Sequence, residues 1–217
     1  MTFVKSSTSS TQPFETPFEH LPTLLPTLAS PSEPSSDAVQ FDLHPASPKF
    51  LKAYSSCLAL YITYLRLHPE WKKMPGRALL HAMESKPTTT KEQQTFSEFS
   101  NIADYVVQKI STMRFRETEY MMALGLLERF VENTKDEFEI SPASAAMTIL
   151  VSLITANKMS TDIPFANATY CYVLSISRTD VFTSEIYFQK SLHMNLSITQ
   201  EQLSDLVKIC ECGMKTV

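Results

Sequence analysis

One segment of the chain, residues 141–157, contains no charged residue and begins with a strong helix-start signal. Ser141 can accept a hydrogen bond from the first turn of a helix, and Pro142 suits the first helical position, where its missing N–H costs nothing. A helix without charges on any side needs neighbours on most sides. The segment also contains polar residues and is shorter than the roughly 20 apolar residues that span a bilayer. We therefore expect the central helix of a helical bundle and no membrane span.

Two charged residues lie on apolar stripes, one at the end of this helix and one in a later helix. Lys158 continues a helically spaced stripe of the central segment, and Glu185 interrupts a stripe of the later one. The first stripe contains Met147, Val151 and Ile154, and the second contains Val181, Phe188 and Leu192. A lysine at a helix end is usually a solvated cap, and a glutamate on a stripe can simply mark its margin. Spacing alone leaves a structural and a functional explanation open for both charges.

The chain after residue 46 has helical periodicity almost throughout. Thr95 with Glu98 three residues later fits a capping box before a long helix, and residues 86–94 are expected to form an exposed linker. Helices are expected from Ser47 to about His68, after Gly76, from Thr95, and over residues 116–133, 141–157, 166–174, 179–193 and 199–210. The chain has only 3 glycines and no alternating β-branched run, which leaves little for tight hairpins. The predicted fold class is all-α.

Composition divides the chain into segments. Residues 1–46 hold more than half of the 13 prolines and are dense in serine and threonine, a composition that buries too little apolar surface to order itself. We expect a disordered tail there. An N-terminal helical extension with the linker follows over residues 47–94, a main helical domain covers residues 95–198, and a last helix occupies residues 199–217.

Charge and motifs exclude several classes of function. The net charge is −4 without a long basic run, which argues against a protein that binds nucleic-acid phosphates. No phosphate-binding loop, metalloprotease motif or nucleophile elbow is present, so we expect neither catalysis nor a cofactor. Cys210 and Cys212 have the spacing of half a metal site but lack a second ligand pair, so no metal is expected. The N-terminus has no secretory signal, which favours an intracellular protein of the cytoplasm or nucleus.

Three stretches, residues 123–133, 154–167 and 184–199, together resemble the cyclins, and specifically the phosphate-signalling, P/U-type branch with a single cyclin box. The resemblance covers about residues 95–200. It rests on Ala156-Asn157-Lys158 followed by an aspartate, Asp162, on an asparagine that begins the next helix, Asn167, and on the spacing of Glu185 and Phe188.

The chain also departs from the cyclin pattern. Leu126-Leu127-Glu128-Arg129 stands where the family has Tyr-Leu-Asp-Arg, and the arginine that pairs with that aspartate has no counterpart in residues 96–103. Met159 replaces an aromatic residue after the lysine, and Gln189 replaces an apolar residue four positions after the glutamate. These departures bear on the choice of partner.

The resemblance implies a cyclin box of five helices around a central third helix, and a non-catalytic subunit that binds a cyclin-dependent protein kinase. Cyclins hold the kinase helix that carries an active-site glutamate in its inward position. Lys158 would then donate to backbone carbonyls of the kinase and Glu185 would accept from its backbone N–H groups. The apolar residues around them would be Met159, Phe188, Met194 and Leu196. Neither charge would then be needed for the stability of the free chain.

Two further classes of function remain open at this stage. A cyclin-fold interaction scaffold without kinase activation would keep the helices and lose the kinase, as Met159, Gln189 and the missing arginine permit. An unrelated helical adaptor, or a helical enzyme whose site is assembled from distant residues, would share only the fold class. Co-purification with a kinase would distinguish a true cyclin from a cyclin-fold scaffold.

Overall fold

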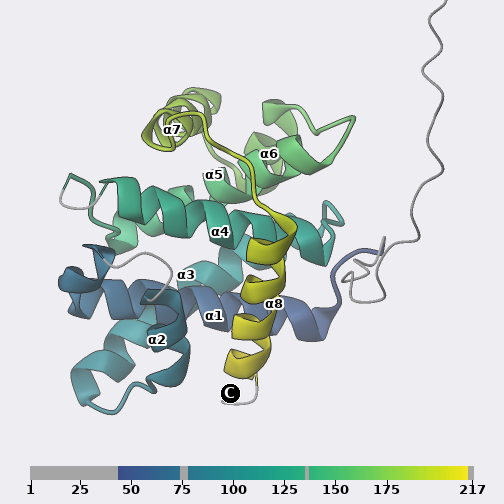
Figure 1. The fold of residues 1–217 in the computed structure, drawn as a ribbon. Coiled ribbons are helices and arrows are strands. Elements are labelled where there is room, and N and C mark those ends of the chain that lie inside the picture. Colours follow the sequence, from purple (N-terminus) through teal and green to yellow (C-terminus); the bar gives the residue numbers. More distant parts are fainter. Residues whose placement is uncertain (1–43, 74–77, 135–136, 215–217) are drawn as a thin grey trace, which may run out of the picture. The chain divides into compact units, whose positions relative to one another are not determined.

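The computed structural model describes residues 44–73, 78–134 and 137–214, except the side chains of residue 73 and residues 212–214. The chain divides into two units, residues 1–38 and 39–217, and all described residues belong to the second. The disordered tail predicted for residues 1–46 lies outside the described residues up to residue 43. In the described part, eight α-helices and one short 3-10 helix occur without any strand, so the all-α prediction is confirmed (Figure 1).

The helices follow one another with short connections. Their bounds are α1 Pro48–Leu67, the 3-10 helix η1 Pro69–Lys73, α2 Ala78–Glu84, α3 Thr90–Ser111, α4 Glu117–Thr134, α5 Pro142–Ser160, α6 Asn167–Leu174, α7 Arg178–Ser191 and α8 Gln200–Met214. None of these helices, within the ranges just given, combines the length and apolarity that a membrane-spanning helix needs.

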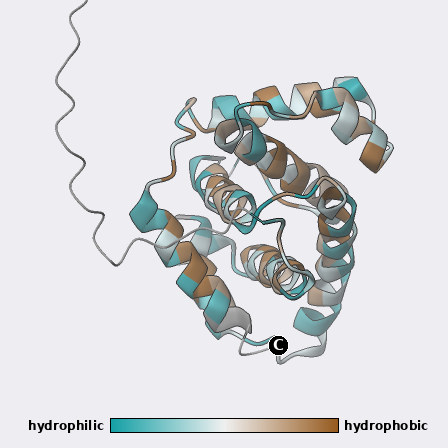
Figure 2. Ribbon diagram, turned by 90° about the vertical axis from the view of Figure 1, so that its right-hand side faces the viewer, coloured by the Kyte–Doolittle hydropathy of each residue, from teal (hydrophilic) through white to brown (hydrophobic). Residues whose placement is uncertain are grey.

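Helix α5 is the central element, as the uncharged segment 141–157 predicts. The Ser141 hydroxyl accepts a hydrogen bond from the backbone N–H of Ser144, and Pro142 occupies the first turn. Every residue from 148 to 157 is buried. Helices α3, α4 and α7 all pack against α5. Figure 2 shows the consequence, with apolar residues concentrated on the inward sides of the helices.

The start of α3 differs from the prediction. The helix begins at Thr90, and Thr89 is its N-cap, with a hydroxyl that accepts from the backbone N–H of Glu92 at 3.2 Å. The Glu92 carboxylate accepts in return from the backbone N–H of Thr89 at 2.9 Å, which completes a capping box. Thr95 lies inside the helix, where its hydroxyl donates to the carbonyl of Lys91. The capping box predicted at Thr95 is therefore wrong, and residues 90–94 of the predicted linker are helical.

The residues just before α1 belong to the fold. The backbone N–H of Ala46 donates to the carbonyl of Phe115 at 2.8 Å, and the Ser47 hydroxyl donates to Glu117 at 3.2 Å. Ser47 also caps α1 by accepting from the backbone N–H of Phe50. Pro45 and Ala46, at the end of the predicted tail, are thus paired with the connection between α3 and α4.

Helix α8 crosses α4 and α1 on one side of the bundle and also packs against α2 (Figure 1). Gly125, in the middle of α4, faces it. A Cβ atom at Gly125 would lie 2.9 Å from Cδ1 of Leu206 and 3.2 Å from Cδ1 of Ile198. Such a close neighbour is the expected reason for a glycine inside a helix, where it otherwise costs ~1 kcal/mol relative to alanine.

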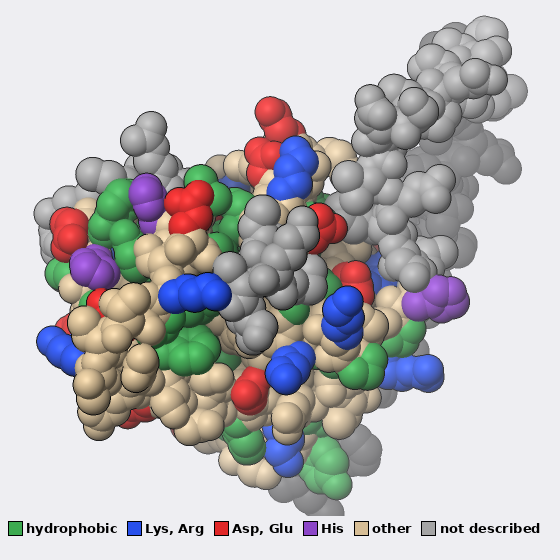
Figure 3. Space-filling model, turned by 90° about the horizontal axis from the view of Figure 1, so that it is seen from below, with side chains coloured by type: hydrophobic (Ala, Val, Ile, Leu, Met, Phe, Trp, Pro, Cys, Tyr) green, Lys and Arg blue, Asp and Glu red, His purple; other side chains and the backbone are tan. Residues whose placement is uncertain are grey.

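Figure 3 shows the face of the bundle opposite α6 and α7. On this face Lys and Arg side chains are interspersed with Asp and Glu, and neither sign forms an extended area of its own.

Candidate functional site

The two charges singled out by the sequence form an ion pair. Lys158, in the last turn of α5, places its Nζ 2.6 Å from Oε1 of Glu185, in the middle of α7. The two side chains are unequally buried: Glu185 is 7% exposed and Lys158 is 29% exposed. The carboxylate of the pair is therefore buried, and the lysine side chain is partly accessible to solvent.

Glu185 receives hydrogen bonds from three helices. Besides Lys158 of α5, the Asn167 amide at the start of α6 donates to Oε2 at 3.0 Å. The Gln189 amide, one turn later in α7, donates to Oε1 at 3.2 Å. Charge-assisted bonds of this kind offset the cost of burying a carboxylate. Glu185 thus joins α5, α6 and α7 at one point.

This geometry corrects the expectation for both charges. Glu185 does not mark the margin of its stripe, since Val181, Phe188 and Leu192 are all buried as well. Lys158 is not a solvated cap. Three of the lone-pair positions of Glu185 are filled from within the chain, which leaves little capacity for a partner. Lys158 uses one of its three N–H groups on Glu185, and two remain for further bonds.

The structure separates the four predicted apolar contact residues. Met159 and Met194 are exposed, at 48% and 61%. Phe188 is 1% exposed and stacks on Phe130, with ring centroids 4.8 Å apart, so in the free chain its side chain lies in the core. Leu196 is half-buried and packs against the core. The apolar stripe of α7 is part of the core because α4 and α5 cover it.

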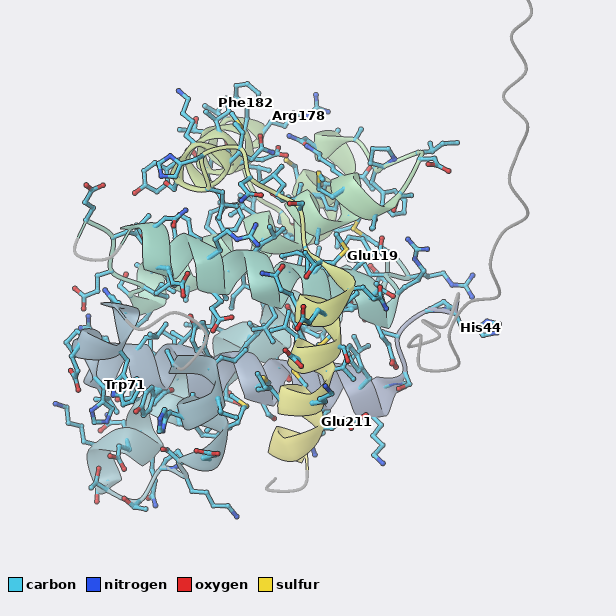
Figure 4. All side chains as sticks on the ribbon, viewed as in Figure 1. His44, Trp71, Glu119, Arg178, Phe182 and Glu211 are labelled. Carbon is cyan, nitrogen blue, oxygen red and sulfur yellow. The ribbon has the colours of Figure 1, made fainter. Side chains whose placement is uncertain are left out.

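Exposed apolar side chains gather instead at the end of the bundle formed by the C-terminal turn of α5, the connection to α6, helices α6 and α7, and the residues that directly follow α7. We call this region the α5–α7 end. Seven of the nine large exposed apolar side chains among the described residues belong to it: Met159, Ile163, Phe165, Tyr172, Phe182, Tyr187 and Met194. Ile163 and Tyr172 are 87% and 86% exposed. Figure 4 shows Phe182 and Arg178 projecting outward from α7. Apolar exposure concentrated in one region is typical of a protein-binding surface.

A second buried polar cluster, which sequence reasoning missed, lies next to the ion pair. Glu119, at the end of α4 nearest α6, is 3% exposed (Figure 4). Its Oε1 accepts from the Asn157 amide at 2.7 Å and from the hydroxyls of Ser160 and Thr161, each at 3.0 Å. Its Oε2 accepts from the backbone N–H of Arg116 at 2.6 Å. The cluster fixes the C-terminal turn of α5, and with it the position of Lys158.

Tyr170 of α6 extends the Glu119 cluster. Its hydroxyl donates to Oδ1 of Asn157 at 2.6 Å. Burial raises the pKa of Tyr170, and the carboxylates of Glu119 and Glu185 raise it further. The phenol therefore stays a hydrogen-bond donor at neutral pH. An asparagine at the end of an otherwise apolar helix, Asn157, was the sequence signal for this cluster.

Glu128 lines a cavity of about 380 Å³ between α4 and α8. Its Oε1 is buried and accepts no hydrogen bond from any part of the described chain. Burial, with a smaller contribution from Glu132, raises the pKa of Glu128 to about 7. The neighbouring Arg129 instead donates to the carbonyls of Asn195 and Ser197, at 2.8 and 3.1 Å. Arg129 thereby holds the connection between α7 and α8.

Comparison of the chain with models of known protein families, with curated proteins and with solved structures finds no match.

Proposed function

We propose that this chain is a non-catalytic, cyclin-type subunit that binds a cyclin-dependent protein kinase through its α5–α7 end. The observation that carries the proposal is the placement of Lys158, a cation held in position by Glu185 at an end of the bundle that exposes large apolar side chains. An apolar surface with a fixed hydrogen-bond donor suits a partner that offers an apolar helix and free backbone carbonyls.

The order of the helices supports this proposal. Helices α3 to α7 are five consecutive helices, and the third of them, α5, is buried without interruption from residue 148 to residue 157. Helices α3, α4 and α7 pack on α5, and α6 packs on α3 and α7. This arrangement fits the five-helix box that the sequence resemblance implies, with α1 and α2 as the N-terminal extension and α8 as the last helix.

The proposed mechanism gives the two charges different tasks. Lys158 donates its two remaining N–H groups to backbone carbonyls of the kinase, while Glu185 orients the lysine and has little contact with the kinase. Met159, Ile163 and Tyr172 supply apolar contact area. Docking of the kinase helix on this surface keeps the helix inward, so that its glutamate pairs with the lysine that positions ATP.

Binding experiments with purified cyclin-dependent kinases test the proposal. We expect the full chain to bind at least one kinase of the class in a calorimetric titration, and Tyr172→Glu to weaken that binding at least tenfold. Tyr105→Glu is the matched control, because Tyr105 is also exposed, at 49%, but lies on α3. Lys158→Ala should weaken binding by roughly 30-fold or more, the usual cost of truncating a charge in a buried interface. Absence of binding to every kinase tested, or equal effects of the two tyrosine variants, contradicts the proposal.

The hydrogen bonds within the Glu185 cluster favour a second candidate, a cyclin-fold scaffold that binds another protein through the same end. Because Glu185 already accepts hydrogen bonds from Lys158, Asn167 and Gln189, its charge is balanced without a kinase. A scaffold would bind no kinase, yet its binding to the other partner would still be lost in Tyr172→Glu.

A further inference from the structure

Two cysteines that are far apart in the sequence meet in the core. Cys57 of α1 and Cys210 of α8 place their Sγ atoms 3.5 Å apart, and both residues are buried, at 2% and 5% exposure. Both are free thiols. Cys171, the third described cysteine, lies in α6 and is also buried, away from this pair. The contact between Cys57 and Cys210 joins the first described helix to the last.

We propose that Cys57 and Cys210 form a reversible disulfide under oxidising conditions, which ties α8 to α1. A disulfide has an S–S bond of about 2.05 Å, so the sulfur atoms need to approach by about 1.5 Å. The inference rests on these two residues and does not depend on the proposed kinase partner.

The oxidant in this proposal is a small-molecule disulfide, such as oxidised glutathione. One cysteine thiolate attacks a sulfur of the oxidant, which forms a mixed disulfide and releases one glutathione thiol. The second cysteine then attacks the protein sulfur of that mixed disulfide and releases the second glutathione thiol. Two protein thiols are oxidised and one oxidant disulfide is reduced, and the two protons leave on the two glutathione molecules.

The burial of the pair controls how fast it reacts. The hydrogen bond between Cys57 and Cys210, together with burial, raises the pKa of the Cys57 thiol, so its reactive thiolate is scarce while α8 is packed. The buried sulfur atoms become accessible to the oxidant when the packing of α8 on α1 opens locally. Oxidation is therefore expected to be slow at neutral pH and faster under mildly destabilising conditions.

Two sulfur atoms in contact can also belong to a metal site or simply pack together. In the described part of the chain, no group of three or more His, Cys, Asp or Glu side chains is placed to bind a metal ion. Free cysteines do pack in cores as small apolar side chains. Oxidation chemistry distinguishes the disulfide from packing, because packed thiols without a reactive geometry stay reduced.

The test uses the full chain carrying Cys212→Ser, which removes the neighbouring thiol and leaves Cys57, Cys171 and Cys210. The protein is equilibrated with oxidised glutathione, alkylated and digested without reductant. We expect a crosslinked peptide pair containing Cys57 and Cys210, a free Cys171, and a thermal midpoint raised by roughly 5 °C or more that dithiothreitol reverses.

Cysteine variants supply the controls. In the same Cys212→Ser background, Cys171→Ala should keep the crosslink and the midpoint shift, whereas Cys57→Ala and Cys210→Ala should lose both. The peptide map of the parent protein is decisive by itself, so poor folding of a variant does not obscure the result. Three alkylated cysteines after equilibration, stable glutathione adducts without a crosslink, or a crosslink that involves Cys171 overturns the proposal.

Discussion

Glu185 is a buried carboxylate whose charge is balanced within the chain. Its three donors come from α5, α6 and α7, so removing the carboxylate leaves three helices with unpaired polar groups at one point. Lys158 differs from Glu185 because it is 29% exposed, so its ammonium group can be solvated when its partner is missing. From the sequence alone there was no reason to treat the two charges differently, whereas the structure shows that Glu185 is buried and Lys158 is partly exposed.

We expect Glu185→Ala to destabilise the chain by about 2–4 kcal/mol, because it leaves a lysine and two amides without their acceptor. Lys158→Ala should cost less, about 1–2 kcal/mol, because Glu185 keeps two amide donors. Urea unfolding of both variants, followed by circular dichroism, measures the difference. Equal losses below about 0.5 kcal/mol, the scatter for surface substitutions, would show that the ion pair is not part of the fold.

Glu128 makes stability depend on pH. Its pKa of about 7 in the folded chain lies above the ordinary value of 4.5. A carboxyl group with a raised pKa binds its proton more tightly in the folded state, so its contribution to stability is greatest below about pH 4.5 and is lost as the pH rises to about 7. Glu128→Gln keeps the shape of the side chain and removes the titration.

The substitution Glu128→Gln should therefore raise the free energy of unfolding by about 1–3 kcal/mol at pH 8 and change it little at about pH 4.5. Glu132→Gln is a useful comparison, since Glu132 is the smaller cause of the shift and should give a smaller gain. Urea unfolding at the two pH values measures both variants. A gain of the same size at both pH values would mean that the Glu128 carboxyl is not the titrating group.

Part of the site could be predicted from the sequence. A lysine and a glutamate on apolar stripes were recognisable as unusual, because helical spacing is a local property. Their direct contact was not predictable, since it depends on how α5 and α7 cross. The burial of Phe188 and the hydrogen bonds around Glu119 were unpredictable for the same reason. Both are set by neighbours that are distant in the sequence, and periodicity carries no information about those neighbours.

The start of α3 illustrates the same limit for a whole helix. Apart from one proline, residues 86–94 are all polar or charged, so no apolar stripe begins there. Hydrophobic periodicity therefore places the start of the helix too late. The true signal was chemical: Thr89 and Glu92 have the three-residue spacing of a capping box. Helix α1 and helix α5 were placed correctly because in them the cap directly precedes the apolar stripe.

A pair of threonine variants tests this assignment of the cap. Thr89→Ala should destabilise the chain by about 1 kcal/mol, because the backbone N–H of Glu92 loses its acceptor. Thr95→Ala removes only a hydroxyl that donates to a carbonyl already bonded within the helix, and should change stability by less than about 0.5 kcal/mol. Thermal unfolding of both variants is the measurement. The reverse order of the two effects would restore Thr95 as the start of the helix.

The described helices depend on one another through α5. Helices α3, α4 and α7 pack on it directly, and α1 is joined to it through α3 and α4. Every residue of α5 from 148 to 157 is buried, so a truncation there leaves a cavity shared by several helices. A fold organised in this way should unfold in one step, because no group of helices keeps its own separate core.

Leu153→Ala tests this cooperativity. Leu153 is fully buried, and its truncation should cost about 3–4 kcal/mol through lost burial and the cavity left behind. The chain has a single tryptophan, Trp71, which lies in η1 against Tyr64 and His81, far along the chain from α5. Tryptophan fluorescence therefore reports on the α1–α2 side, while circular dichroism reports on all helices. We expect both signals to shift to lower urea concentration together. A fluorescence transition that stays at its original midpoint would show that α1 and α2 fold independently of α5.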